Sequence, residues 1–143
     1  MGMYKELSIL IAEDDDGHAE LIQEGLFDSG VRNEMIRFSN GEEIWDYLIG
    51  NGGKDVRDPN KNYIVLLDIK MPKLDGLELL KRIKTDDSMK EIPVIMLTTT
   101  DDPREVEACY QMGCNFYVIK PVDFRKFTET LRRLGLFIQE VKF

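Results

Sequence analysis

Apolar residues follow two alternating patterns along this chain: short continuous runs, and longer stretches in which they recur every three or four residues. The continuous runs are too short for ordinary helices and are typical of strands buried on both faces. They cover residues 7–12, 63–67, 94–97 and 116–119, and a weaker alternation at 34–38 predicts an edge strand. The helical spacing predicts helices at residues 19–26, 42–49, 74–84, 103–112 and from 123 to about 142.

Strands and helices alternate in this prediction, in five strand–helix units. That order is typical of a parallel sheet, because right-handed crossovers place the helices on its two faces. We predict an α/β fold of the flavodoxin-like type, a doubly wound (βα)5 parallel sheet with strand order 2-1-3-4-5. Residues 1–143 are expected to form a single domain, with a core at about 5–135 and a C-terminal helix extension at 136–143.

Charge and hydropathy exclude several classes of function. The net charge of −8 argues against a nucleic-acid surface, which requires a basic patch. No apolar run approaches the ~20 residues of a membrane span, and the first residues lack the apolar segment of a signal peptide. The two cysteines, Cys109 and Cys114, have no further cysteine or nearby histidine to complete a zinc site. We expect a cytoplasmic protein with reduced thiols, and neither nucleic acid nor membrane as a partner.

Acidic residues follow two of the predicted strands at their carboxyl ends, where open α/β sheets bind ligands. Glu13 and Asp14 follow the first strand and Asp68 follows the third, its neighbour in the sheet, so the three carboxylates should converge. Two carboxylates ~4 Å apart, at an effective dielectric of ~20, repel by roughly 4 kcal/mol. The cluster therefore requires a cation, and hard oxygen ligands favour Mg²⁺. Asp15 and Asp16 are expected to cap the first helix instead of joining the site.

Two more side chains would complete a site for a phosphoryl group. Thr98 follows the fourth strand and Lys120 ends the fifth, so a hydroxyl donor and a positive charge can reach phosphoryl oxygens. With Mg²⁺ beside it, Asp68 could attack phosphorus and hold the group as an acyl phosphate. On its own stretch, Asp68 could instead be a turn or capping residue. Lys120→Ala is expected to leave the thermal midpoint unchanged or raised, unless the ammonium group pairs with Asp68.

These residues resemble the receiver domain of two-component response regulators, in matching order and over about residues 5–135. The matching segments are Glu13-Asp14 after the first strand, LLDIKMPKLDG around Asp68, Thr98 after PVIML, and Lys120-Pro121 after YVI. The resemblance implies a phosphoacceptor signalling protein and not a true enzyme, since its only reactions would be phosphotransfer to itself and slow loss of the phosphoryl group.

The resemblance also assigns a role to each residue of the site. It implies that Asp68 is the phosphoacceptor and that Mg²⁺ is bound by Asp68, the two acids after the first strand and the backbone carbonyl of Lys70. Thr98 would be the switch hydroxyl, Tyr117 the switch aromatic and Lys120 the invariant lysine of the family. Tyr117 could also be an ordinary half-buried strand residue.

Finer features are similar to the small regulators paired with bacterial phytochrome kinases. They are AEDDDGHAELIQEGL, the long loop at 50–62, LTTTDDPREVEACYQMGCNFYVIKPV and the closing LRRLGLF. The acidic run departs from the family, because Asp16 stands in place of a common proline. The resemblance implies a stand-alone regulator that takes its phosphoryl group from a histidine kinase, with a bacteriophytochrome as the candidate. An unknown downstream protein would then bind the altered surface of the helix at 103–112, the strand at 116–119 and the last helix.

The last predicted helix is longer than the strands against which it would pack. About 20 residues of helix span ~30 Å, whereas strands of five or six residues span ~17–20 Å. Gly135 could bend the helix, and the overhang beyond it carries five apolar residues: Leu136, Phe137, Ile138, Val141 and Phe143. Such a patch favours a homodimer, and the resemblance implies that the surface at 103–112, 116–119 and the last helix contributes to it. The alternative is a tail that folds back over the domain.

Two other classes of function fit the predicted fold but lack a residue at a key position. A Mg²⁺-dependent aspartyl-phosphate phosphatase or phosphotransferase needs a second acid two residues after the nucleophile, where this chain has Lys70. A flavodoxin-like nucleotide-binding protein needs glycines in the first strand–helix turn, where this chain has acids. His18, the only histidine, is expected to be a solvated residue of the first helix.

Overall fold

The computed structural model describes residues 7–51, 53 and 55–140. Within these residues, strands and helices alternate as the sequence pattern predicts. They are β1 (Leu7–Ala12), α1 (Asp16–Asp28), β2 (Glu34–Phe38), α2 (Gly41–Ile49), β3 (Asn62–Leu67), α3 (Gly76–Thr85), β4 (Val94–Thr98), α4 (Pro103–Gln111), β5 (Phe116–Ile119) and α5 (Phe124–Glu140). No helix among them combines the length and apolar composition that a membrane span requires.

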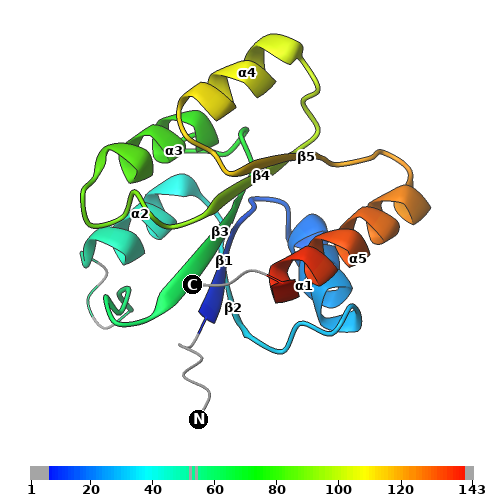
Figure 1. Ribbon diagram of the computed structural model, residues 1–143, viewed down its shortest axis with the longest axis horizontal. Helices are drawn as coiled ribbons and strands as arrows, with labels where there is room; N and C mark the ends of the chain where they lie inside the picture. The colour runs from blue at the N-terminus through cyan, green and yellow to red at the C-terminus, as the bar shows by residue number, and fades with distance from the viewer. Residues whose placement is uncertain (1–6, 52, 54, 141–143) are drawn as a thin grey trace.

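The five described strands form one parallel sheet in the order β2-β1-β3-β4-β5, which confirms the predicted flavodoxin-like topology. Figure 1 shows α1 and α5 on one face of the sheet and α2, α3 and α4 on the other. Side chains of β3 alternate between the two layers: Ile64 and Leu66 pack with α1 and α5, whereas Val65 and Leu67 pack with α2 and α3. The continuous apolar run is therefore explained by burial on both faces.

Capping residues decide where two of the helices begin. The first helix begins at Asp16 and not at residue 19, because the side chain of Asp15 accepts a hydrogen bond from the backbone N–H three residues later. The third helix begins at Gly76 and not at residue 74, because Asp75 caps it in the same way. Both differences follow from acids that end the preceding loop and satisfy the first free N–H groups of a helix.

The packing of α5 on α1 corrects one expectation about the last helix. The helix does not end at Gly135 but continues through it to Glu140. A Cβ at Gly135 would lie only 1.8 Å from Ser29 Oγ, so the glycine allows α5 to approach the end of α1 closely. Ile138, expected in an exposed overhang, is only 2% exposed because it packs in the core between these helices.

Both cysteines are buried and free, as expected. Burial raises the pKa of the Cys109 thiol, and it raises the pKa of Cys114 to about 11. Little reactive thiolate is therefore present at about pH 8. We expect neither thiol to react with Ellman's reagent within minutes in the folded protein, and both to react at once in guanidinium chloride. Rapid reaction of the folded protein would contradict this assignment.

Candidate functional site

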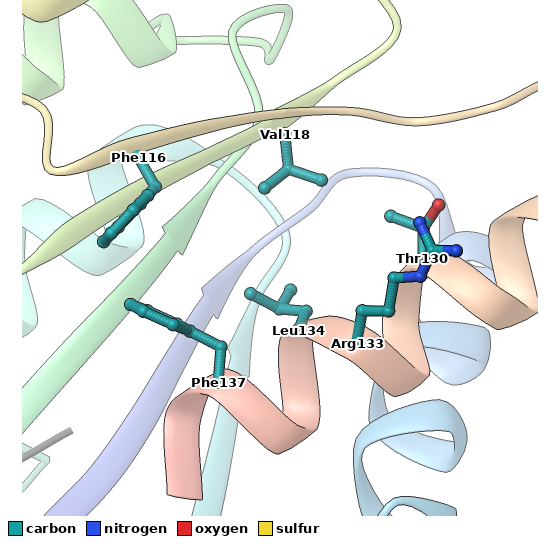
Figure 2. A pocket seen from close by; sticks show the side chains of 6 residues that line it. All are labelled: Phe116, Val118, Thr130, Arg133, Leu134 and Phe137. Carbon is teal, nitrogen blue, oxygen red and sulfur yellow. The ribbon is translucent and has the colours of Figure 1, made fainter. Parts of the chain in front are cut away.

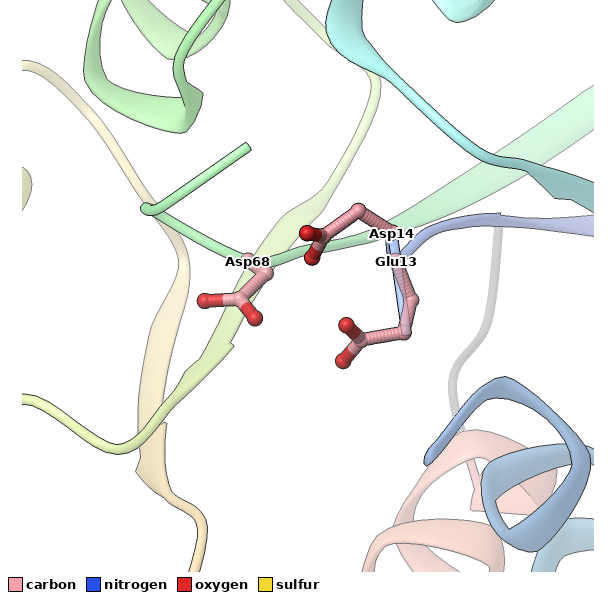
Figure 3. Close-up of side chains that lie close together, drawn as sticks. All are labelled: Glu13, Asp14 and Asp68. Carbon is pink, nitrogen blue, oxygen red and sulfur yellow. The ribbon is translucent and has the colours of Figure 1, made fainter. Parts of the chain in front are cut away.

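Three carboxylates meet at the carboxyl ends of β1 and β3 (Figure 3). The parallel register pairs Ala12 with Leu67, so the residues that follow the two strands lie at the same level. One carboxylate oxygen from each of Glu13, Asp14 and Asp68 lies within 4.8 Å of the others. The predicted convergence is therefore confirmed, and the cluster has the hard oxygen donors that could hold a divalent cation.

The three acids differ in burial. Glu13 is only 2% exposed, and its carboxylate accepts a hydrogen bond of 3.1 Å from the backbone N–H of Asp15. The side chain of Asp68 is 13% exposed, whereas Asp14 is exposed. The cluster is therefore closed on the side of Glu13 and open to solvent on the side of Asp14, where an ion or a small donor can enter.

A glycine after β3 allows α3 to pack against the backbone of Asp68. The N–H of Gly76 donates a 2.7 Å hydrogen bond to the carbonyl of Ile69. A Cβ at Gly76 would lie 2.1 Å from the carbonyl oxygen of Asp68, closer than any real contact allows. The turn signal Asp75-Gly76 in the sequence therefore caps α3 and fixes the segment that carries Asp68.

Lys120 lies buried between two of the carboxylates. Its ammonium group forms ion pairs with Glu13 and, at 3.0 Å, with Asp68 Oδ2. Burial acts to lower the pKa of Lys120, but the hydrogen bond to Glu13 and the attraction of Asp68 outweigh it, so the pKa is raised. The ammonium group is therefore charged at neutral pH, and the pairing with Asp68 replaces the expectation of an unchanged thermal midpoint for Lys120→Ala.

Thr98 ends β4 at the same edge of the sheet. It is 1% exposed, and no group in the described part of the chain hydrogen-bonds its Oγ1. A buried hydroxyl without a partner is costly and calls for an explanation. The backbone N–H of Lys120 donates to the carbonyl of Thr98 at 2.7 Å, which holds the two residues side by side. The unpartnered hydroxyl and the ammonium group are suited to binding an oxyanion at Asp68.

Two further residues, Tyr117 and Lys70, were assigned a role by resemblance. Tyr117 is half-buried in β5, and its hydroxyl donates a 2.6 Å hydrogen bond to the carbonyl of Thr100. Burial raises the pKa of Tyr117 to about 12, so the hydroxyl remains a donor at neutral pH. Lys70 is exposed two residues beyond Asp68. The switch role of Tyr117 and the metal-binding role of the Lys70 carbonyl stay predictions.

His18 is a solvated residue of the first helix, as expected, with 43% of its side chain exposed, but its ring also reaches the site. Its Nδ1 lies 3.5 Å from Lys120 Nζ and 4.0 Å from Glu13 Oε1. One signal in the sequence pointed to this placement: His18 follows the acidic pair by four residues, so the first turn of its helix must begin beside the site. Helical periodicity alone could not show which side of that turn faces Lys120.

The sequence profile described as "Response regulator receiver domain" matches residues 9–132. The chain belongs to the response regulator receiver domain family. Receiver domains take phosphate from histidine kinases and bind Mg²⁺ at an acidic pocket. This protein is thus a signalling protein of the receiver type, and its acidic cluster lies where such a pocket is expected.

Several solved structures are similar to this receiver. A receiver domain from Rhodospirillum rubrum is 39% identical, with a TM-score of 0.88 over 94% of this chain and 95% of that one. The response regulator Rcp1 of Synechocystis is 36% identical over 112 residues, 78% of this chain and 75% of Rcp1. A Mn²⁺-bound structure of a response regulator Rcp1 aligns at 30% identity with a TM-score of 0.86, over 98% of each chain.

The resemblance to regulators of the phytochrome group is also confirmed. The phosphorylated cyanobacterial phytochrome response regulator RcpA is 28% identical, with a TM-score of 0.84 over 96% of this chain and 97% of RcpA. This receiver therefore has relatives that were solved with a divalent cation bound and in a phosphorylated state.

Proposed function

We propose that this receiver accepts a phosphoryl group on Asp68 from a histidine kinase, with Mg²⁺ as cofactor, and thereby switches a protein-binding surface. The observation that carries the proposal is the buried Thr98 hydroxyl, which lacks a partner among the described residues, at the sheet edge where Lys120 meets Asp68. A phosphoryl group on Asp68 would give both donors an oxygen acceptor. The relatives of the phytochrome group support a bacteriophytochrome as the kinase.

The transfer forms one bond and breaks one bond. A carboxylate oxygen of Asp68 bonds to phosphorus while the bond from phosphorus to the donor breaks, and the donor's leaving atom keeps that electron pair. The ammonium group of Lys120 and the hydroxyl of Thr98 donate to the phosphoryl oxygens as charge shifts onto them. Both donors are buried, so their hydrogen bonds to the oxyanion form in a site of low dielectric.

The donor set fits Mg²⁺, with Glu13, Asp14 and Asp68 as ligands. The backbone carbonyl of Lys70 is proposed as a further ligand. When bound, Mg²⁺ would offset the charge of the carboxylates and of the phosphoryl oxygens.

Intact-mass measurement after incubation with acetyl phosphate and Mg²⁺ tests the proposal: we expect one phosphoryl group to be added, and none when Mg²⁺ is removed with EDTA. An unchanged mass with Mg²⁺ present would contradict it.

Asp14→Asn is expected to weaken Mg²⁺ binding by at least about tenfold, because the exposed carboxylate of Asp14 supplies charge to the cluster. Titration of Trp and Tyr fluorescence, or of amide NMR shifts, measures the affinity. Asp16→Asn is the matched control, since Asp16 is an exposed neighbour that pairs with Arg37 outside the cluster. Equal affinity in Asp14→Asn and the parent protein would place the metal site elsewhere.

We also propose that the protein forms a homodimer through α4, β5 and α5. An apolar groove of about 240 Å³ lies between β5 and α5. Figure 2 shows the side chains that line it. Phe116 and Phe137 face each other across it with ring centroids 4.5 Å apart, although both remain more than a third exposed. Exposed bases on α5, such as Arg132, and exposed acids on α4, such as Glu107, could pair across a two-fold axis.

Phe137→Glu is expected to weaken this dimer by about thirtyfold or more, since a central aromatic residue at an interface contributes ~2 kcal/mol or more. Sedimentation at micromolar concentration measures it. Ile49→Glu is the control, because Ile49 is an exposed apolar residue of α2, away from this face.

Truncation after Gly135 is a poorer test, since it would remove the buried Ile138. A parent protein that is monomeric with or without phosphate would contradict the proposal. Val141 and Phe143 of the expected overhang lie outside the described residues.

A further inference from the structure

The buried ammonium group of Lys120 has three N–H donors, and the structure provides three acceptors for them. Two are carboxylate oxygens, from Glu13 and from Asp68. The third is Nδ1 of His18, at 3.5 Å. This third contact is longer than an ordinary hydrogen bond and is the weakest of the three, but it is the one that a residue outside the acidic cluster contributes.

The geometry indicates which tautomer His18 adopts. A proton on Nδ1 would point a second donor at the ammonium group only 3.5 Å away, and the nearest carboxylate oxygen, Glu13 Oε1, is 4.0 Å from Nδ1 and too far to accept it well. With the proton on Nε2, Nδ1 presents a lone pair to the Lys120 ammonium group. The contacts therefore favour the Nε2–H tautomer.

Two contacts position His18, one through its backbone and one through its ring. Its backbone N–H donates to Asp15 Oδ1 at 2.8 Å, which fixes the first turn of α1. Its ring meets Phe127 of α5 edge-on, with centroids 5.9 Å apart and planes at 78°. Phe127 is itself buried in the core. The backbone of His18 is thus fixed by the start of α1 and its ring is oriented by Phe127 of α5, while 43% of the side chain remains exposed.

We propose that His18 is a positioning residue of the phosphoryl site: its Nδ1 is the third acceptor of the Lys120 ammonium group and keeps that group directed at Asp68. This inference rests on the proposed function. When Asp68 carries a phosphoryl group, a phosphoryl oxygen replaces the Asp68 acceptor, while Glu13 and His18 still hold the other two N–H groups. Without His18, the ammonium group can rotate and shift away from the reacting atoms.

Kinetic measurements on two substitutions test the proposal. Asparagine can place its side-chain oxygen near the position of Nδ1, whereas leucine fills similar space without an acceptor. His18→Leu is expected to slow phosphorylation by acetyl phosphate about three- to tenfold, as loss of one such hydrogen bond implies. His18→Asn should stay within about twofold of the parent protein by the same arithmetic. Gln23→Leu, a neutral polar residue changed to leucine farther along α1, is the control and should not differ from the parent.

A purely structural role would give a different pattern. If His18 only packs against Phe127, the leucine variant would be the less perturbed of the two, so an equal or greater rate in His18→Leu than in His18→Asn would overturn the proposal. Thermal midpoints of all variants would show whether lost stability accounts for the rates. Equal slowing by asparagine and leucine would also overturn it.

A second measurement does not depend on phosphorylation. His18 is the only histidine, so ¹⁵N-edited NMR of the whole protein gives a single imidazole spectrum. We expect the Nε2–H tautomer, with an Nδ1 resonance that shifts in Lys120→Met; an Nδ1–H tautomer, or an Nδ1 resonance indifferent to Lys120→Met, would overturn the inference. If the parent protein takes up no phosphoryl group at all, the proposed function fails, and the tautomer and its response to Lys120→Met decide the His18 contact separately.

Discussion

Asp68→Asn is expected to abolish phosphoryl addition from acetyl phosphate. An amide is not a nucleophile toward phosphorus, and asparagine has almost the shape of aspartate, so the loss should be chemical and not structural. Lys120, which contacts Asp68 Oδ2 in the parent protein, keeps its other partner, Glu13, in this variant. The buried charge of Lys120 therefore stays paired and the fold is preserved.

Intact-mass measurement in the presence of Mg²⁺ compares the variant with the parent protein. Asp16→Asn is the control. Asp16 is an exposed acid two residues from Asp14, and it pairs with Arg37. The Asp16→Asn protein should accept a phosphoryl group normally. Peptide mapping after borohydride reduction then identifies the modified residue in the parent protein. Labelling that persists in Asp68→Asn would show that another acid is the phosphoacceptor.

Lys120→Met is expected to lower the free energy of unfolding at pH 7 by about 3–5 kcal/mol. The reason is Glu13, which is 2% exposed and would be left as a buried carboxylate without its cation. Urea unfolding measures the change. Lys126→Met, on the exposed face of α5, is the matched control and should change stability by less than about 0.5 kcal/mol.

The decrease in the free energy of unfolding of Lys120→Met should depend on pH. Burial raises the pKa of Glu13 above its ordinary value even with the lysine present, and removing Lys120 raises it further. The folded variant then binds a proton more tightly than the unfolded chain, so its stability rises as the pH falls toward the unfolded pKa. We expect the deficit of Lys120→Met to be smaller at pH 5 than at pH 7.

A double substitution separates a lost ion pair from lost packing. Glu13→Gln combined with Lys120→Met removes the more deeply buried of the two carboxylates that lose their cation, and leaves only the partly exposed Asp68 without one. The double variant should therefore recover most of the stability that Lys120→Met loses. A loss of less than about 1 kcal/mol in Lys120→Met, the value for an exposed pair, would contradict the buried ion pair.

The sequence by itself determined the fold and the place of the site. The apolar runs at 7–12 and 116–119 and the alternation at 34–38 have the bounds of β1, β5 and β2, because such patterns, flanked by charged or turn residues, are local features of the chain. The meeting of Glu13, Asp14 and Asp68 was predictable because each follows a strand of a parallel sheet, whose carboxyl ends lie at one edge.

The tertiary structure alone decided which partners those residues have. Lys120 contacts Glu13 across 107 residues of sequence and His18 across 102, and no local pattern encodes such a pairing. The burial of Glu13 beside the exposed Asp14 depends on the direction in which each side chain leaves β1, and the burial of Ile138 depends on how closely Gly135 lets α5 approach Ser29. Periodicity fixes which residues share a face of a helix or strand, whereas contacts between elements depend on how closely those elements pack.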